Sequence, residues 1–214
     1  MFPIQTITPG GYGSGYSARY ADPTAIAKRQ HDLVTRWGTA VSPGSTVLEL
    51  GCADGFSTEY MTKQGLRVTG VDASPEMLDA ATSRFLAAGH EPAFLEADVN
   101  QLEPDLPYDV VLGLMWTFCR YVEDQAATIA RLAANTRVKL LVDVNPRETP
   151  IDDAVAAMRA AGFTSVTWRA FFVPQRYRLP AVAQPAVRVA ERTPVVRDVV
   201  LRRKFVAVVK GEWA

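Results

Sequence analysis

One stretch of the chain, residues 47–58 (VLELGCADGFST), joins an apolar run to a turn of small residues. Its first four residues predict a short buried strand, and a helix is predicted from Phe56. The small residues of the turn are Gly51, Ala53 and Gly55. They leave room for a ligand to lie directly against the backbone, although Ala53 requires a negative φ to do so. Because ligands of doubly wound sheets bind where a strand gives way to a helix, this stretch is the candidate cofactor loop.

Two acidic residues accompany the loop. Glu49 lies within the predicted strand, and Asp72 follows Gly51 by 21 residues at the end of the next predicted strand. A carboxylate at that distance can accept hydrogen bonds from ribose hydroxyls. Glu49 disfavours a pyrophosphate, and Phe56 stands where a dinucleotide-binding loop has its third small residue. The two carboxylates therefore favour a cationic cofactor that carries a ribose.

These residues resemble the motifs of class I S-adenosylmethionine-dependent methyltransferases. The stretches that carry the resemblance are VLELGCADG (47–55), VTGVDASPEML (68–78), LEADVNQL (95–102) and YDVVLGLMWTF (108–118). Ala53 departs from the pattern, which usually has glycine there. The resemblance covers residues 20–145 and implies S-adenosylmethionine as the cofactor, whose ammonium and sulfonium groups suit a nearby carboxylate.

The resemblance also implies where the cofactor lies. Asp72 would hold the ribose, and Asp98 would face the adenine amino group. The other expected cofactor contacts are Tyr20, Glu49, Gly51, Cys52, Ala53, Gly55, Ala73, Met77, Val99 and Leu114.

The methyl acceptor must be recognised outside these loops. Relatives that methylate nucleobase amines or glutamine amides carry an Asn/Asp-Pro-Pro-Tyr/Phe motif after the fourth strand, whereas this chain has LMWTF at 114–118. The pattern is similar to that of small-molecule methyltransferases. The expected substrate contacts are Tyr16, Trp116, Phe118, Tyr121 and Asn145.

Methyl transfer to a hydroxyl needs a group that takes the proton. The candidate catalytic residues are Asp143, after the fifth predicted strand, and His31, in the first predicted helix. They favour O-methylation of a metabolite or a sugar-like compound, while N-methylation of a small amine needs no strong base and stays open. A nucleotide-dependent oxidoreductase and a cofactor-binding relative without catalysis are further alternatives. No metal is expected, because residues 112–115 lack the Asp of metal-dependent catechol-type relatives.

Composition narrows the partners. The 214 residues, 48% hydrophobic and 21% charged, are typical of one globular domain. Lys and Arg (23) balance Asp and Glu (23), and a net charge of zero disfavours binding to a nucleic-acid backbone. No apolar run approaches the roughly 20 residues of a membrane span, and two cysteines cannot build a disulfide framework. We therefore expect a cytoplasmic protein with a small-molecule substrate and with neither nucleic acid nor membrane as a partner.

Strands alternate with helices along most of the chain, which predicts a doubly wound α/β fold. We expect a mostly parallel seven-stranded sheet with helices on both faces and an antiparallel last strand. The predicted strands cover 47–50, 67–71, 93–96, 108–114, 138–142, 165–173 and 199–209. The first predicted helix begins at Asp22-Pro23, and four further helices are predicted at 56–64, 75–88, 122–134 and 150–162.

The two ends of the chain differ from this pattern. Residues 1–22 are rich in glycine and tyrosine, which favours a flexible lid over the cofactor cleft, with a frayed terminus as the alternative. The methyltransferase domain is expected to cover residues 23–214. A Pro-rich, basic insertion at 174–198 separates the last two strands without a clear crossover helix, and its arginines would contact the acceptor or form a homodimer interface.

Overall fold

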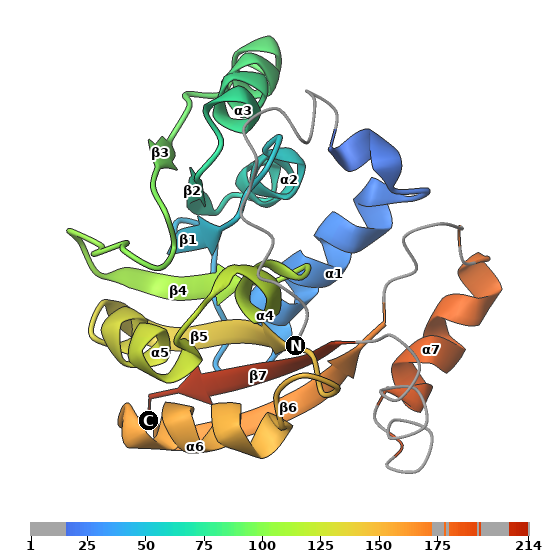
Figure 1. Cartoon of the computed structure of the whole chain (residues 1–214). Coiled ribbons are helices and arrows are strands. Elements are labelled where there is room, and N and C mark those ends of the chain that lie inside the picture. The colour runs from blue at the N-terminus through green and yellow to red at the C-terminus, as the bar shows by residue number, and fades with distance from the viewer. Residues whose placement is uncertain (1–15, 173–177, 179, 192, 194–205, 214) are drawn as a thin grey trace.

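The computed structural model describes residues 16–172, 178, 180–191, 193 and 206–213. The strands form one seven-stranded sheet in the order β3-β2-β1-β4-β5-β7-β6 (Figure 1). Their bounds are β1 Thr46–Leu50, β2 Arg67–Asp72, β3 Phe94–Glu96, β4 Tyr108–Gly113, β5 Thr136–Val144, β6 Ser165–Phe171 and β7 Val206–Glu212. Strands β1 to β5 are parallel, and β7 is antiparallel to both of its neighbours. The doubly wound prediction with an antiparallel last strand is confirmed.

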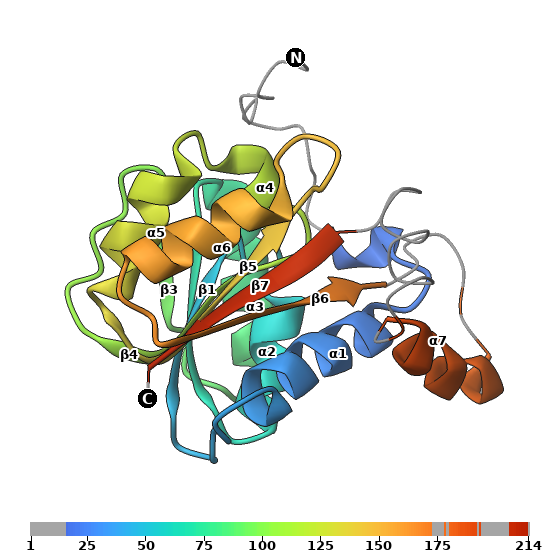
Figure 2. The same cartoon turned by 90° about the horizontal axis from the view of Figure 1, so that it is seen from below.

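Helices cover both faces of the sheet. They are α1 Pro23–Arg36, α2 Phe56–Lys63, α3 Pro75–Ala87, α4 Thr117–Tyr121, α5 Gln125–Ala133, α6 Ile151–Ala160 and α7 Gln184–Ala190, with short turns η1 Ser17–Arg19 and η2 Ala181–Ala183. Figure 2 shows α1 and α2 on one face and α5 and α6 on the other. No described helix is long and apolar enough to cross a membrane.

The helix starts follow from the sequence. The Asp22 side chain accepts a hydrogen bond from the Ala25 N–H at 2.9 Å, and proline occupies the first turn of α1. Ser74 does the same for α3, where its hydroxyl accepts from the Met77 N–H at 3.3 Å. These caps satisfy N–H groups that have no partner inside the helix.

The core consists of two apolar layers, one on each face of the sheet. In β1, Leu48 packs into the layer under α5 and α6, whereas Val47 packs into the layer under α1 and α2. In β4, Val111 and Leu112 divide in the same way. Successive side chains of a strand point to opposite faces, so a strand covered on both faces is mostly apolar on both. This is why both strands appear in the sequence as short apolar runs, interrupted in β1 only by Glu49.

Three predicted elements need correction. The predicted helix at 122–134 is wrong at its start, because residues 117–121 form α4 and α5 begins only at Gln125. The Asp124 side chain caps α5 by accepting from the Ala127 N–H at 2.9 Å, so a residue taken for helix interior is a start signal. Strand β5 is longer than predicted, since it pairs with β4 and β7 at 136–144. The insertion contains α7, and residues 199–205 of the predicted last strand lie outside the described residues.

Candidate functional site

A cleft opens at the carboxyl ends of β1 and β4, two adjacent strands at which the chain switches direction across the sheet. Its walls are the loop after β1, the turn after β4, the start of α1 and the turn η1. The residues that line it are Tyr16, Ser17, Tyr20, Pro23, Ile26, Gln30, Glu49, Gly51, Cys52, Ala53, Asp54, Phe56, Ser57, Leu114 and Met115. Most of the cofactor contacts expected at 20 and 49–55 therefore come together here.

The loop after β1 is built from left-handed backbone positions. The φ angles are +66° at Gly51, +49° at Ala53 and +70° at Gly55. The negative φ expected for Ala53 is wrong: its side chain is accommodated in a conformation that costs an ordinary residue about 1–2 kcal/mol. At Gly51 a Cβ atom would lie 2.5 Å from the Thr117 Oγ1. The loop thus passes so close to α4 that only glycine fits.

Gly51→Ala should lower the free energy of unfolding by about 2 kcal/mol, because it adds both backbone strain and a clash with Thr117. Gly89→Ala is the matched control: its φ is +72°, but nothing lies within 4 Å of an added Cβ. Urea melts of both variants separate strain from clash. If the two variants lose the same stability, the contact with Thr117 contributes nothing.

Asp72 holds the loop in place. Its carboxylate accepts hydrogen bonds from the Ala53 N–H at 2.9 Å and the Ser74 N–H at 3.0 Å, and so ties the loop after β1 to the start of α3. Burial raises its pKa. Neither Asp72 nor the other expected contacts after β2 and β3 are among the residues that line the cleft; Ala73 and Asp98 are exposed, and Met77 and Val99 are buried.

Glu49 is a buried carboxylate at the base of the cleft. It is 4% exposed and accepts a hydrogen bond from the Thr58 hydroxyl at 2.6 Å. Burial raises its pKa to about 7. A cationic group in the cleft would stabilise the ionised form and gain binding energy from it.

The two candidate bases lie elsewhere. Asp143 has no exposed surface, and its carboxylate accepts from the backbone N–H groups of Trp116 and of Cys119, the latter at 2.9 Å. Burial raises its pKa to about 6. His31 packs against Tyr60 with ring centroids 6.0 Å apart, and burial lowers its pKa. Neither residue lines the cleft, so Asp143 is placed to position the start of α4 rather than to take a proton from a substrate.

The expected acceptor contacts are dispersed. Tyr16 lines the cleft and accepts a hydrogen bond from the Tyr20 hydroxyl at 2.8 Å. Trp116 is half-buried just before α4, whereas Phe118 is fully buried in the core. The Tyr121 carbonyl accepts from Asn100 at 2.9 Å. Asn145 is buried, and its Oδ1 lies 3.3 Å from the Arg147 Nε.

Sequence reasoning missed a clasp between the N-terminal segment and the cofactor loop. The Asp54 carboxylate accepts from the Ser17 hydroxyl at 2.6 Å, from the Ser17 N–H at 3.0 Å and from the Arg84 Nη2 at 3.3 Å. Arg84 also donates to the Asp54 carbonyl at 2.9 Å. The clasp fixes η1, and with it the two cleft tyrosines, beside the loop.

Asp54→Asn should weaken binding of S-adenosylhomocysteine about threefold to tenfold, because the amide cannot accept from all three donors. Asp109→Asn is the control, since Asp109 likewise accepts from one residue's N–H and hydroxyl, those of Thr46, and pairs with Arg137 far from the cleft. Calorimetry should show a change for the first variant only. Equal affinities would mean that the clasp does not shape the cofactor site.

Residues 47–139 match a family model described as a methyltransferase domain. These residues belong to a methyltransferase domain, in agreement with the class I S-adenosylmethionine-dependent type that the motifs resemble. The cleft fits that cofactor, since the buried Glu49 carboxylate and the small residues Gly51 and Ala53 all line it. No group of three or more His, Cys, Asp or Glu side chains suited to a metal occurs among the residues that the structure describes.

Curated relatives of the methyltransferase domain include three bacterial enzymes. Malonyl-[acyl-carrier protein] O-methyltransferase of Serratia marcescens is 31% identical over 62% of this chain and 51% of that protein. Ubiquinone biosynthesis O-methyltransferase of Nitrosospira multiformis is 30% identical over 54% and 50%. Trans-aconitate 2-methyltransferase of an Enterobacter species is 30% identical over 58% and 48%. The chain thus spans about half the length of the curated relatives it matches.

Solved structures share the fold of the methyltransferase domain. Magnesium protoporphyrin IX methyltransferase of Synechocystis with bound S-adenosylmethionine has a TM-score of 0.59 and is 20% identical, over 89% of this chain and 76% of that chain. The [4+2]-cyclase SpnF has a TM-score of 0.63 at 17% identity, over 89% and 81%. Since a cyclase shares this architecture, the fold by itself does not determine the reaction.

Proposed function

We propose that the chain transfers a methyl group from S-adenosylmethionine to an oxygen atom of a small molecule. The observation that carries the proposal is the cleft after β1 and β4, where the backbone at Gly51 is open beside the buried Glu49 carboxylate. When bound, S-adenosylmethionine supplies an activated methyl group. Glu49 and Asp72 would hold its cationic and ribose parts, and the clasp at Asp54 would keep the tyrosines over it. The O-methyltransferase names of two relatives support oxygen as the acceptor atom.

We further infer that the accepting group is a carboxylate. A carboxylate oxygen is already ionised near neutral pH, so alignment replaces proton removal, and alignment can contribute about 7–11 kcal/mol. Among the described residues, the candidate bases Asp143 and His31 do not line the cleft. The Tyr20 hydroxyl is hydrogen-bonded to Tyr16, and burial raises the pKa of Tyr20. Glu49 is bonded to Thr58 at the base of the site. This arrangement is better suited to a carboxylate than to the hydroxyl expected from the sequence.

Methyl-transfer assays with radiolabelled S-adenosylmethionine test both parts of the proposal. The panel should pair small carboxylic acids with their amides, and should include phenols, alcohols and amines. We expect label in products that mild base hydrolyses, because carboxyl methyl esters are base-labile whereas methyl ethers and N-methyl amines are not. If all labelled products were stable to base, the inference that the acceptor is a carboxylate would be overturned. A chain that binds S-adenosylhomocysteine but transfers no methyl group across the panel would oppose the proposed catalysis.

A further inference from the structure

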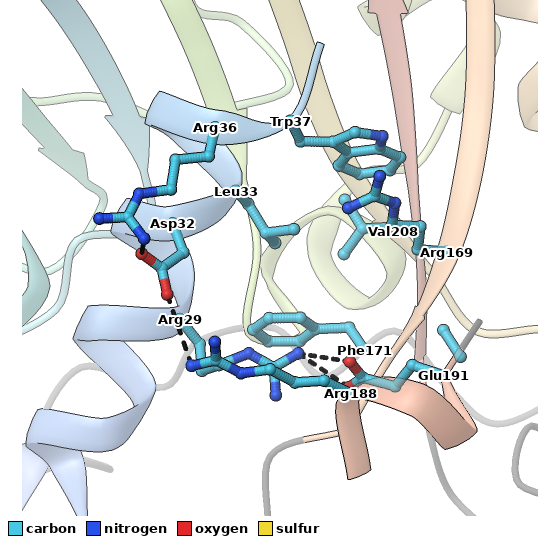
Figure 3. Close-up of a pocket in the computed structure, with 11 residues that line it drawn as sticks. Arg29, Asp32, Leu33, Arg36, Trp37, Arg169, Phe171, Arg188, Glu191 and Val208 are labelled. Atoms are coloured by element: carbon cyan, nitrogen blue, oxygen red, sulfur yellow. Dashed lines mark hydrogen bonds and ion pairs between the residues drawn. The ribbon is translucent and has the colours of Figure 1, made fainter. Parts of the chain in front are cut away.

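A second cavity, of about 220 Å³, borders a different face of α1 from the cofactor cleft. It is bounded by α1, by β6 and β7, and by the end of α7 (Figure 3). Ile26 and Gln30 of α1 line the cofactor cleft, whereas Arg29 and Leu33 line this cavity, and no residue lines both. The cavity is therefore distinct from the cofactor cleft, although both border α1.

The cavity gathers positive charge. Its charged lining residues are Arg29, Arg36, Arg169 and Arg188, against Asp32 and Glu191. Four guanidinium groups and two carboxylates leave an excess of two positive charges, although the whole chain has a net charge of zero. Low-dielectric walls around charges of one sign concentrate their field, so the hollow attracts anions.

The ion pairs in the cavity differ in tightness. The Arg29 Nη2 lies 2.6 and 2.8 Å from the two carboxylate oxygens of Glu191, which is a close charge-assisted contact. Asp32 lies 3.6 Å from Arg36 and 3.7 Å from Arg188, longer than a hydrogen bond (Figure 3). The side chains of Arg36 and Arg188 are 76% and 45% exposed. Both can turn toward a ligand without breaking a close bond.

The rest of the lining is apolar. Trp37 is 4% exposed, and the Arg169 guanidinium carbon lies 4.6 Å from its ring centroid. Arg29 lies 5.3 Å from the centroid of Phe171. Leu33 and Val208 complete an apolar floor between these rings. The cavity thus combines cationic groups with a surface on which an apolar body can rest.

We propose that this cavity is a second ligand site, which binds a small organic anion with an apolar body: a carboxylate or a phosphate monoester. Both groups match the planar fork of arginine, which donates two parallel N–H bonds. The volume is below the roughly 300–1,000 Å³ of sites for drug-sized ligands, so the ligand is small. The proposal does not rest on the carboxylate acceptor argued above, because no residue lines both sites.

Calorimetric titration of the full chain, saturated with S-adenosylhomocysteine so that the cofactor cleft is occupied, tests the site. The probes are benzoate and phenyl phosphate, with benzyl alcohol as the uncharged counterpart. We expect at least one anion to bind at least about tenfold more tightly than benzyl alcohol. Which of the two binds more tightly identifies the headgroup. A dissociation constant above about 10 mM for both anions would overturn the proposal.

Matched variants locate the binding. Arg188→Gln removes one of the loosely paired guanidiniums and should weaken anion binding about tenfold, while benzyl alcohol should be unaffected. Arg137→Gln is the control, since Arg137 lies outside the cavity, is 54% exposed and also has its acid at 3.7 Å. Arg36→Gln, at the most exposed arginine of the cavity, gives an independent second variant. Equal loss in Arg188→Gln and Arg137→Gln, or no loss in either cavity variant, would overturn the site.

Discussion

Asp72→Ala is expected to weaken binding of S-adenosylmethionine about a hundredfold in calorimetry, which corresponds to about 2.7 kcal/mol. The variant removes the acceptor of two backbone hydrogen bonds, from Ala53 at 2.9 Å and Ser74 at 3.0 Å. It also removes the carboxylate that we expect to hold the ribose. Each bond to a charged group is worth about 1.5–3 kcal/mol, so the loss of loop shape and of ligand contact together accounts for the effect.

Two further variants make this expectation specific. Asp72→Asn keeps the shape and one acceptor oxygen, and should recover part of the affinity. Asp124→Ala removes another carboxylate that accepts a backbone N–H at 2.9 Å, at the start of α5, and should leave cofactor binding unchanged. A folded Asp72→Ala protein that binds with the original affinity would remove Asp72 from the cofactor site.

The conformation of the candidate cofactor loop could be predicted because its causes are local. An apolar strand, small residues and a helix start follow one another within residues 47–58, and the left-handed angles at Gly51 and Gly55 require the residue type that the sequence provides. The position of Asp72 could be predicted as well, because it directly ends the next apolar strand of the sequence. The sheet could be predicted equally well, since strands covered on both faces are mostly apolar.

The region after β4 was harder to predict. Met115 and Trp116 adopt φ angles of +60° and +72° without being glycine, so nothing local indicates the sharp turn that starts α4. The turn exists because the buried Asp143 accepts backbone N–H groups from it, across 24 and 27 residues of sequence. An acid that follows a strand looks the same in a sequence whether it faces a substrate or supports a helix.

Contacts between segments that are distant in the chain could not be predicted from the sequence. Asp54 and Ser17 are 37 residues apart, and Glu191 and Arg29 are 162 apart. Each of these residues is of a type that is usually solvated, and only the fold brings its partner near. The clasp at the cofactor loop and the cavity behind α1 therefore became visible only in the structure.

Asp143→Ala should lower the free energy of unfolding by about 3 kcal/mol or more. The N–H groups of Trp116 and Cys119 would lose their acceptor in a place with no exposed surface, and each unsatisfied buried donor costs about 1–3 kcal/mol. Urea melts measure the loss. Because Met115 lines the cleft beside this turn, turnover should fall as well. A variant of unchanged stability would show that the turn does not depend on Asp143.

The pH dependence of stability distinguishes two influences on Asp143: burial, which raises its pKa, and backbone hydrogen bonds, which lower it. Burial raises its pKa to about 6, whereas an unfolded chain has an aspartate pKa of about 3.9. Between these values the folded state holds the proton and the unfolded state does not, so stability falls as pH rises through that window and levels off above it. The difference between the folded and unfolded pKa of Asp143 corresponds to a loss of about 3 kcal/mol in the free energy of unfolding across this window.

Asp143→Asn provides the reference, because asparagine has no proton to exchange. The free energy of unfolding of the original protein minus that of Asp143→Asn should therefore fall as pH rises through the window from about 3.9 to about 6. Backbone hydrogen bonds to the carboxylate act in the opposite direction, since they favour its ionised form. A difference that rises with pH would mean that these bonds outweigh burial and that Asp143 stabilises the start of α4 as a carboxylate throughout this range. A falling difference would mean that the turn before α4 is held by an acid that becomes ionised only near neutral pH.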